Sequence, residues 1–180
     1  MKIISGKLKG RSISINKKEN YRPTLSRIRE DLFNLINHNK ILNLDLKKSV
    51  FCDLFCGSGS IGLEALSRGA KKVIFNDINN LTINTVKDFL VKNKLNNYEI
   101  YNHDAYNMSQ SIFNNVDIFY IDPPYEYDLN KLEGNIYSLI SKNCSIIIET
   151  DQELDKHRDL IMRKKYRNKN LFFLRKTSKI

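Results

Sequence analysis

The chain has 180 residues, of which 41% are hydrophobic, and a formal net charge of +10. That length suits one domain with a hydrophobic core, so we predict a single domain over residues 1–180. No apolar run approaches the roughly 18 residues of a membrane span, and the N-terminus lacks the apolar region of a signal peptide. The cysteines and histidines show neither disulfide nor metal-binding spacing. We therefore expect a reduced, monomeric, cytoplasmic protein with no metal and no membrane partner.

Basic side chains are concentrated toward the two ends of the chain. Residues 1–49 carry 12 basic and 4 acidic side chains, and residues 151–180 carry 10 and 4. The central residues 50–150 carry 8 basic and 12 acidic side chains. A near-neutral to acidic centre between basic ends is typical of a ligand-binding domain with a rim that binds a polyanion. Solvated surface lysine is the alternative interpretation.

The first 22 residues contain two short apolar pieces, 2–5 and 12–15, on either side of a basic segment with two glycines. This pattern predicts that residues 1–22 form a β-hairpin or arm with a basic tip. The tip carries three cations that would lie along phosphates, namely Lys7, Lys9 and Arg11. A disordered basic tail is the alternative.

A helix is predicted next, because apolar residues recur at helical spacing at Leu25, Ile28, Leu32, Leu35 and Ile36. Pro23 keeps Arg22 extended before this helix. Arg27 and Arg29 are expected to point away from the apolar face near the helix start, where cations oppose the helix dipole. These arginines are therefore candidates for binding an anionic ligand, and a solvated helix is the alternative.

A strand, a glycine-rich turn and a helix follow in the centre of the chain. The apolar run 50–55 predicts a short buried strand, and residues 61–66 predict the helix. Glycines let a backbone approach a ligand closely, and a helix N-terminus offers free N–H groups. The turn and helix start fit a nucleotide-cofactor fingerprint through Gly57, Ser58, Gly59 and Gly62.

Asp53 lies inside the apolar strand, shortly before the glycines. A buried carboxylate needs a partner, and a cation such as the amino group of S-adenosylmethionine (SAM) would suit it. The alternative is an ordinary turn in which Asp53 caps nearby backbone amides.

Two more acids follow the next two predicted strands, residues 73–77 and 98–101. In a doubly wound sheet, the carboxyl ends of the strands line the ligand crevice. Asp77 would accept hydrogen bonds from the 2′,3′-diol of a ribose, unless it caps the helix that follows. Asp104, next to Ala105, would accept a hydrogen bond from the exocyclic amine of adenine.

The most specific motif comes after a fourth predicted strand, residues 116–121, and consists of Asp122, Pro123, Pro124 and Tyr125. Two prolines remove two N–H donors and fix two φ angles, so the carbonyls of this rigid turn stay free to accept. Asp122 and the Pro123 carbonyl would each accept one hydrogen of a substrate amine, while Tyr125 stacks on its ring. A simple strand-ending turn is the alternative.

The remaining residues complete an α/β fold. Residues 129–139 predict a helix, and the apolar run 145–149 predicts a strand buried on both faces. Residues 160–166 and 171–174 predict a closing hairpin.

These motifs resemble the class I SAM-dependent methyltransferases and, more narrowly, the bacterial 16S rRNA guanine-N2 methyltransferase family. The resemblance runs nearly end to end and rests on RPTLSRIREDLFN at 22–34, DLFCGSGSIGLEALSRGA at 53–70 and DPPY at 122–125. It implies a Rossmann-like fold with a seven-stranded, mostly parallel sheet, an antiparallel last strand and helices on both faces. It also implies SAM as the cofactor and 16S rRNA, within the small ribosomal subunit, as the substrate.

Together, the motifs and the resemblance predict roles for individual residues. Cofactor contacts would come from Asp53, Gly57, Ser58, Gly59, Asp77, Asp104 and Ala105. Catalysis would depend on Asp122, Pro123 and Tyr125. RNA contacts would come from Lys7, Lys9, Arg11, Arg22, Arg27 and Arg29. The chain departs from the family in having Asp77 where Glu is common, and in lacking a glycine expected near residues 167–170.

Four other functions share some of these features. A DNA adenine-N6 or cytosine-N4 methyltransferase uses an Asp-Pro-Pro-Tyr motif in the same way. It usually carries a separate target-recognition region, for which 180 residues leave little room. Protein glutamine methyltransferases normally have Asn at the position of Asp122. An NAD-dependent dehydrogenase would explain the glycines alone, and a non-catalytic RNA-binding ribosome-assembly factor would explain the charge alone.

Overall fold

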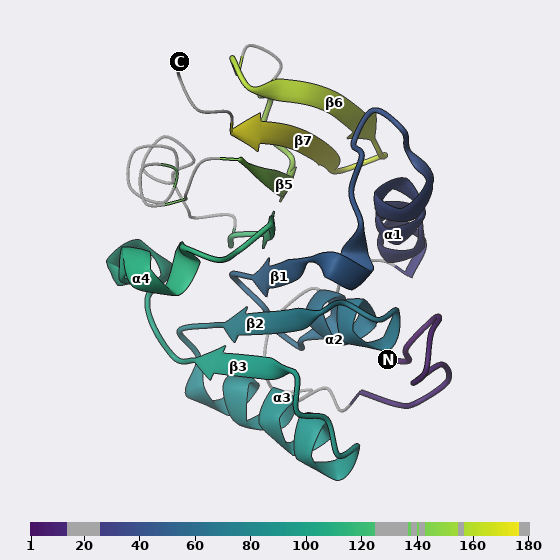
Figure 1. Ribbon diagram of the computed structural model, residues 1–180, viewed down its shortest axis with the longest axis vertical. Coiled ribbons are helices and arrows are strands. Elements are labelled where there is room, and N and C mark those ends of the chain that lie inside the picture. The colour runs from purple at the N-terminus through teal and green to yellow at the C-terminus, as the bar shows by residue number, and fades with distance from the viewer. Residues whose placement is uncertain (14–25, 125–136, 138–139, 141–142, 155–156, 177–180) are drawn as a thin grey trace.

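Seven strands form one sheet in the order β3-β2-β1-β4-β5-β7-β6 (Figure 1). Neighbouring strands from β3 to β5 in this order are parallel, whereas β7 runs antiparallel to both β5 and β6. The strands are β1 (Val50–Asp53), β2 (Lys72–Asn76), β3 (Tyr98–Tyr101), β4 (Ile118–Ile121), β5 (Cys144–Thr150), β6 (Leu160–Lys165) and β7 (Asn170–Lys176).

This computed structural model describes residues 1–13, 26–124, 137, 140, 143–154 and 157–176. The helices of this part are α1 (Ser26–His38), α2 (Ser60–Ser67), α3 (Asn80–Lys92) and α4 (Gln110–Phe113), with short 3₁₀ turns at Leu46–Lys48 and Ala105–Asn107. Within these ranges, no helix combines the length and the apolar character needed to cross a membrane.

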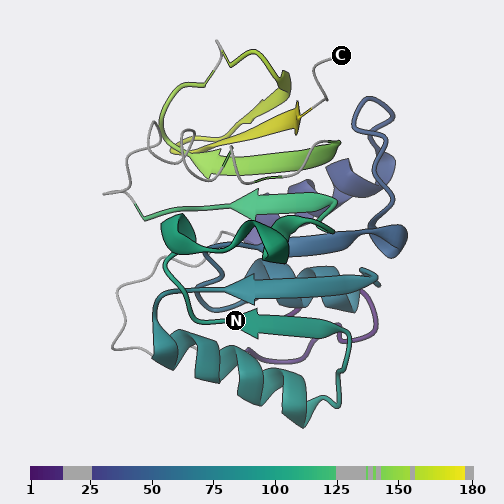
Figure 2. The same ribbon diagram turned by 60° about the vertical axis from the view of Figure 1, so that its left-hand side comes forward.

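The central strands β1, β4 and β5 are buried on both faces, and their successive side chains point to opposite sides of the sheet. Phe51 belongs to the hydrophobic cluster that contains the apolar residues of α1, α2 and α3. The neighbouring Cys52 belongs to a second cluster, which contains Phe113 of α4. Right-handed crossovers explain this division, because the strand order reverses direction between β3 and β4. In Figure 2, α1 and α2 accordingly lie behind the sheet and α4 lies in front of it.

Most predicted elements are confirmed. The five strands and the closing hairpin lie within a few residues of their predicted bounds, and the mostly parallel α/β sheet ends in antiparallel strands as expected. The short helix α4 and the 3₁₀ turn before it were not predicted. The predicted helix 129–139 falls almost entirely outside the described residues.

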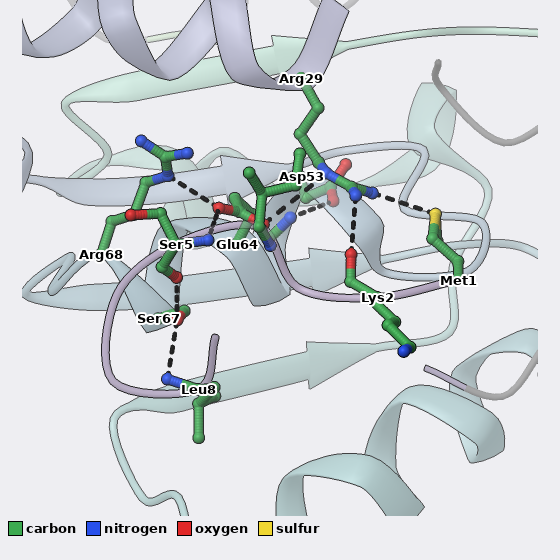
Figure 3. A network of polar contacts seen from close by, with 11 residues as sticks. Met1, Lys2, Ser5, Leu8, Arg29, Asp53, Glu64, Ser67 and Arg68 are labelled. Carbon is green, nitrogen blue, oxygen red and sulfur yellow. Dashed lines mark hydrogen bonds and ion pairs between the residues drawn. The ribbon is translucent and has the colours of Figure 1, made fainter. Parts of the chain in front are cut away.

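The N-terminal segment, described over residues 1–13 of the predicted hairpin or arm, packs against α2 (Figure 3). Its two ends pair through a single antiparallel bridge between Lys2 and Ser12, so the hairpin is rudimentary. The buried Glu64 of α2 accepts the backbone N–H groups of Ile4 at 2.8 Å and Ser5 at 2.9 Å. A buried carboxylate that takes two backbone donors holds this segment firmly.

Gly6 makes this close approach possible. Its φ is +83°, and a Cβ built on it would lie 1.9 Å from the carbonyl oxygen of Ser67. We expect Gly6→Ala to lower the free energy of unfolding by about 2–4 kcal/mol, because strain adds to the loss of the docking hydrogen bonds. Gly10, with φ +82° and no atom within 4 Å of such a Cβ, is the matched control and should cost about 1 kcal/mol when replaced by Ala. Urea unfolding measures both values, and equal losses would mean that docking adds nothing.

Candidate active site at the carboxyl edge of the sheet

Four acids gather where the parallel strands end. Asp53 is the last residue of β1, and Asp77, Asp104 and Asp122 follow β2, β3 and β4 within a few residues. Because these strands are parallel, their carboxyl ends meet at one edge of the sheet. This is the edge at which open α/β sheets bind their ligands, beside the reversal of strand order between β1 and β4.

The glycines of the turn serve different purposes. A Cβ on Gly62 would lie 2.3 Å from the ring of Phe75, so this glycine lets α2 pack closely on β2. Gly59 has φ +73° and precedes α2 as its N-cap, and a Cβ there would lie 2.7 Å from Val86. Gly57 has φ +49°, yet a Cβ on it would meet no atom within 4 Å. Packing therefore explains two of the glycines, whereas Gly57 faces open space that a ligand can fill.

Asp53 is 1% exposed, and its Oδ2 accepts the backbone N–H of Gly62 at 2.8 Å. The alternative interpretation, in which Asp53 caps nearby backbone amides, therefore holds for Oδ2. The other oxygen accepts no hydrogen bond from the described part of the chain. Burial raises the pKa of Asp53 to about 7, against the hydrogen bond from Gly62, and the nearby Asp122 and Asp77 raise it further. Such a carboxyl gains from a cationic ligand.

Asp77 supports the glycine turn. Its Oδ2 accepts the N–H of Gly57 at 2.8 Å, and its Oδ1 accepts the N–H of Asn79 at 2.9 Å. The N-cap of α3 is Asn79, so the alternative role of Asp77 as that cap is wrong. The next residue, Ile78, is 70% exposed although it is apolar, and the sequence interpretation overlooked it. An exposed apolar side chain beside a carboxylate suits a ligand with a flat ring and hydroxyl groups.

Asp104 caps the 3₁₀ turn after β3. Its Oδ1 accepts the N–H of Tyr106 at 3.1 Å, and its Oδ2 accepts the side-chain amide of Asn107 at 3.1 Å. Ala105, the first residue of this turn, is buried. Asp104 therefore lies at the predicted edge, but both of its oxygens already have protein partners.

Asp122 belongs to a network that the sequence interpretation missed. Its Oδ1 accepts a hydrogen bond from the ammonium of Lys169 at 3.0 Å, and the same ammonium lies 2.6 Å from Glu149. Glu149 in turn accepts the hydroxyl of Tyr120. Burial raises the pKa of Asp122 to about 7, and Glu149 raises it further while Lys169 lowers it. Glu149, an acid at the end of the apolar run 145–149, could have indicated a buried charge. The sequence around it does not indicate that its partner is Lys169.

Two predicted site residues, Arg22 and Tyr125, lie outside the described residues. Pro123 is half-buried beside Asp122. Within the described ranges, no group of three His, Cys, Asp or Glu side chains is arranged to hold a metal ion.

Arg29 does not point to solvent, so its predicted role in binding RNA is wrong. It is 1% exposed, and its guanidinium donates to the carbonyl of Lys2 at 2.8 Å and lies 3.7 Å from Glu64 (Figure 3). Leu32 and Phe33 follow it at the i+3 and i+4 positions, so Arg29 shares the buried face of α1. Burial lowers its pKa, against the attraction of Glu64. Its charge serves to neutralise a buried acid of α2.

The other cations predicted to bind RNA, within the described residues, are exposed. Lys7, Lys9 and Arg11 are exposed but lie near Ser67, at the C-terminal end of α2. Because α2 returns the chain to the start of β2, this tip lies at the amino edge of the sheet, away from Asp122. Arg27 is exposed at the start of α1.

Comparison with known proteins identifies the family of this chain. A family model described as "Conserved hypothetical protein 95" matches residues 1–175. The chain belongs to this family. Ribosomal RNA small subunit methyltransferase D of Buchnera aphidicola is 35% identical over 161 residues, which cover 87% of this chain and 79% of the relative. A putative rRNA methyltransferase of Bacillus subtilis, YlbH, is 34% identical and covers 92% of both chains. The structure of a putative methyltransferase, yhhF, from Escherichia coli has a TM-score of 0.76 at 25% identity and covers 99% of both chains.

The family match spans all three motif segments, 22–34, 53–70 and 122–125. The predicted family and the predicted class I methyltransferase fold are both confirmed. The chain is a methyltransferase, and the dehydrogenase and the non-catalytic binding factor are set aside.

Proposed function

We propose that this enzyme transfers a methyl group from SAM to the N2 amine of a guanine in 16S rRNA. The observation that carries the proposal is the placement of Asp122 and Pro123 at the same sheet edge as the glycine turn and Asp53. The names of the relatives support an rRNA substrate. Such a substrate would place the enzyme in the cytoplasm, and the small ribosomal subunit would be its partner.

The residues of the edge fit SAM. The open space at Gly57 admits a ligand against the backbone. The unpaired oxygen of Asp53 would bind the amino group, and Asp77 would bind the ribose hydroxyls. The exposed Ile78 would cover one face of the adenine, while Asp104 would contact its amine through remaining lone pairs. Four carboxyl groups also suit a ligand whose sulfonium and ammonium outweigh its one carboxylate.

When bound, SAM supplies an electrophilic methyl group, so the protein mainly has to orient the acceptor amine. The lone pair of a guanine amine is delocalised into the ring, which makes it a poor nucleophile. Asp122 and the Pro123 carbonyl would accept its two hydrogens, favour a pyramidal nitrogen and stabilise the positive charge that develops there. The base must leave its stack to reach them, so a guanine in a loop or single strand costs less to present.

Transfer of tritium from methyl-labelled SAM tests this proposal. Purified enzyme is incubated with 16S rRNA, with small ribosomal subunits depleted of the modification, and with duplex DNA, and the labelled nucleosides are separated. We expect label in N2-methylguanosine from one of the two RNA substrates. Label on adenine or cytosine of DNA would establish the DNA alternative, and no transfer to any substrate would overturn the proposal.

Asp77→Ala should weaken SAM binding by about tenfold or more, because a charge-assisted hydrogen bond contributes about 1.5–3 kcal/mol. The variant removes the acceptor for the ribose and also releases the N–H of Gly57. Titration calorimetry measures the affinity. Asp88→Ala, at an exposed position of α3, is the control for losing one acidic charge. An unchanged affinity in folded Asp77→Ala would remove Asp77 from the cofactor site.

Charge reversal at Lys7, Lys9 and Arg11 should flatten the dependence of RNA affinity on salt. Each lost phosphate contact lowers the slope of log K against log salt by about 0.7 for single-stranded RNA, so three contacts lower it by about 2. SAM affinity should not change, because the tip lies at the amino edge. Reversal of three exposed lysines of α3 and the turn after it, Lys87, Lys92 and Lys94, controls for net charge. Equal slopes for both triple variants would identify the tip as ordinary solvated surface.

A further inference from the structure

The turn between β6 and β7 contains Lys169, whose side chain contacts the candidate catalytic acid, Asp122. Asn170 pairs with Thr150 at the carboxyl end of β5, so the turn before β7 lies at the active-site edge. The turn is closed by a hydrogen bond from the N–H of Tyr166 to the carbonyl of Lys169, 2.8 Å long. Although Lys169 is far from Asp122 in sequence, its side chain reaches into the space between β4 and β5.

Lys169 is held on one side by a buried acid and contacts Asp122 on the other. Its ammonium lies 2.6 Å from Oε1 of Glu149 and 3.0 Å from Oδ1 of Asp122. The side chain of Glu149 is 1% exposed, whereas those of Lys169 and Asp122 are 16% and 21% exposed. Tyr120 donates its hydroxyl to the other oxygen of Glu149. The chain of contacts therefore runs from the sheet core to the edge where substrate enters.

Oδ1 of Asp122 accepts from Lys169, and the described residues donate no hydrogen bond to its other oxygen, which is therefore available to a substrate amine. We propose that Lys169 is a positioning residue that favours the ionised form of Asp122 and fixes its carboxylate plane for the acceptor amine. The inference rests on the proposed function, because it assigns Lys169 a role in that reaction. The basic closing hairpin would thereby contribute to the active site through Lys169, which acts on Asp122.

Charge balance explains why such a residue is needed. Two carboxylates one strand apart repel each other, and a third acid, Asp53, lies nearby on β1. An opposite charge within about 4–6 Å lowers a carboxyl pKa by roughly 1–3 units, and Lys169 is that charge for Asp122. The pKa of Lys169 itself is raised, because Asp122 and Glu149 outweigh the effect of burial. The described groups that face this cluster are Asp53 of β1, Tyr120 of β4, Glu149 of β5, and Lys169 and Tyr166 of the turn.

The experiment is the pH dependence of single-turnover methyl transfer at saturating SAM and RNA. In Lys169→Met, the acid limb of the profile should move up by about one pH unit or more, since Asp122 keeps its proton to a higher pH. The rate should fall at least tenfold on that limb and recover at high pH, while SAM affinity should not weaken. Lys169→Arg should retain the wild-type limb, because it retains the charge.

Glu149→Gln removes the repelling acid, so its acid limb should move in the opposite direction, to lower pH. The double variant Lys169→Met/Glu149→Gln does not leave Glu149 as a buried acid without its lysine, so it keeps the test possible if Lys169→Met does not fold. The acid limb of the double variant should lie at a higher pH than that of Glu149→Gln. The difference should equal the shift between Lys169→Met and the wild type. Lys165→Met, which removes an exposed cation of β6, should leave the limb unchanged.

The inference is overturned if the wild-type enzyme methylates RNA but the acid limb of Lys169→Met lies at the wild-type pH. The same conclusion holds if the acid limb of the double variant lies at the pH found for Glu149→Gln. A uniform loss of rate at every pH would also overturn it, because that result describes a purely structural lysine. Failure of the proposed function looks different, since the wild-type enzyme would then transfer no methyl group to RNA at any pH.

Discussion

Asp122→Ala is expected to lower the single-turnover rate of methyl transfer by about 10²-fold or more, on the scale of losing one oriented electrostatic group. The reason is that the carboxylate holds the amine most strongly when the nitrogen gains positive charge, which happens in the transition state. RNA affinity should therefore stay nearly unchanged. Rapid-quench methylation at saturating SAM gives the rate, and a separate filter-binding titration gives the RNA affinity.

Graded variants make this result specific. Asp122→Asn keeps an acceptor oxygen but loses the charge, so its rate should lie between those of the wild type and Asp122→Ala. Asp117→Ala is a useful control, because Asp117 precedes β4 at the amino edge and accepts the N–H of Val50 at 2.7 Å. That variant should lose stability without a specific loss of chemistry. If Asp122→Ala methylates at close to the wild-type rate, the turn after β4 is merely the end of a strand.

The position of the site could be predicted from sequence because it depends on local patterns and one general rule. Apolar runs identified the strands, and the glycines identified the turn before α2. The rule that parallel strands bind ligands at their carboxyl ends then brought Asp53, Asp77 and Asp122 together without any contact being known. Each of these acids lies at that edge in the structure.

What sequence could not supply are partners that lie far apart along the chain. The prediction that Arg29 points to solvent was an error of helical spacing, because Arg29 lies four residues after Leu25 and three before Leu32, on the apolar face. What the spacing could not supply is its partner, Glu64 of α2, a buried acid 35 positions away that needs a cation. Lys169 shows the same limit, because its partners belong to β4 and β5 and become neighbours when β7 pairs antiparallel to β5.

The affinity for SAM should fall as pH decreases below about 7, and Asp53→Asn should remove most of this dependence. SAM carries an ammonium group that binds the ionised carboxyl, and the pKa of Asp53 is raised to about 7 by burial. Affinity should therefore be full above pH 7 and lose up to about tenfold per pH unit below it. At pH 8, Asp53→Asn should bind SAM about 10- to 100-fold more weakly, because it loses a charge-assisted contact. Titration calorimetry at pH 6, 7 and 8 measures both proteins.

The same substitution should stabilise the SAM-free fold, which separates loss of a ligand contact from structural damage. The folded chain binds the proton of Asp53 more tightly than the unfolded chain, so stability falls as pH rises from about 4 to 7. An asparagine can still accept the N–H of Gly62 and never ionises, so Asp53→Asn should be more stable by about 1–3 kcal/mol above pH 7 and unchanged near pH 4. A variant that is less stable at pH 8 and binds SAM normally would assign Asp53 to the turn alone. A variant that is more stable yet binds SAM poorly would show that this buried charge is kept at a cost to folding because the cofactor needs it.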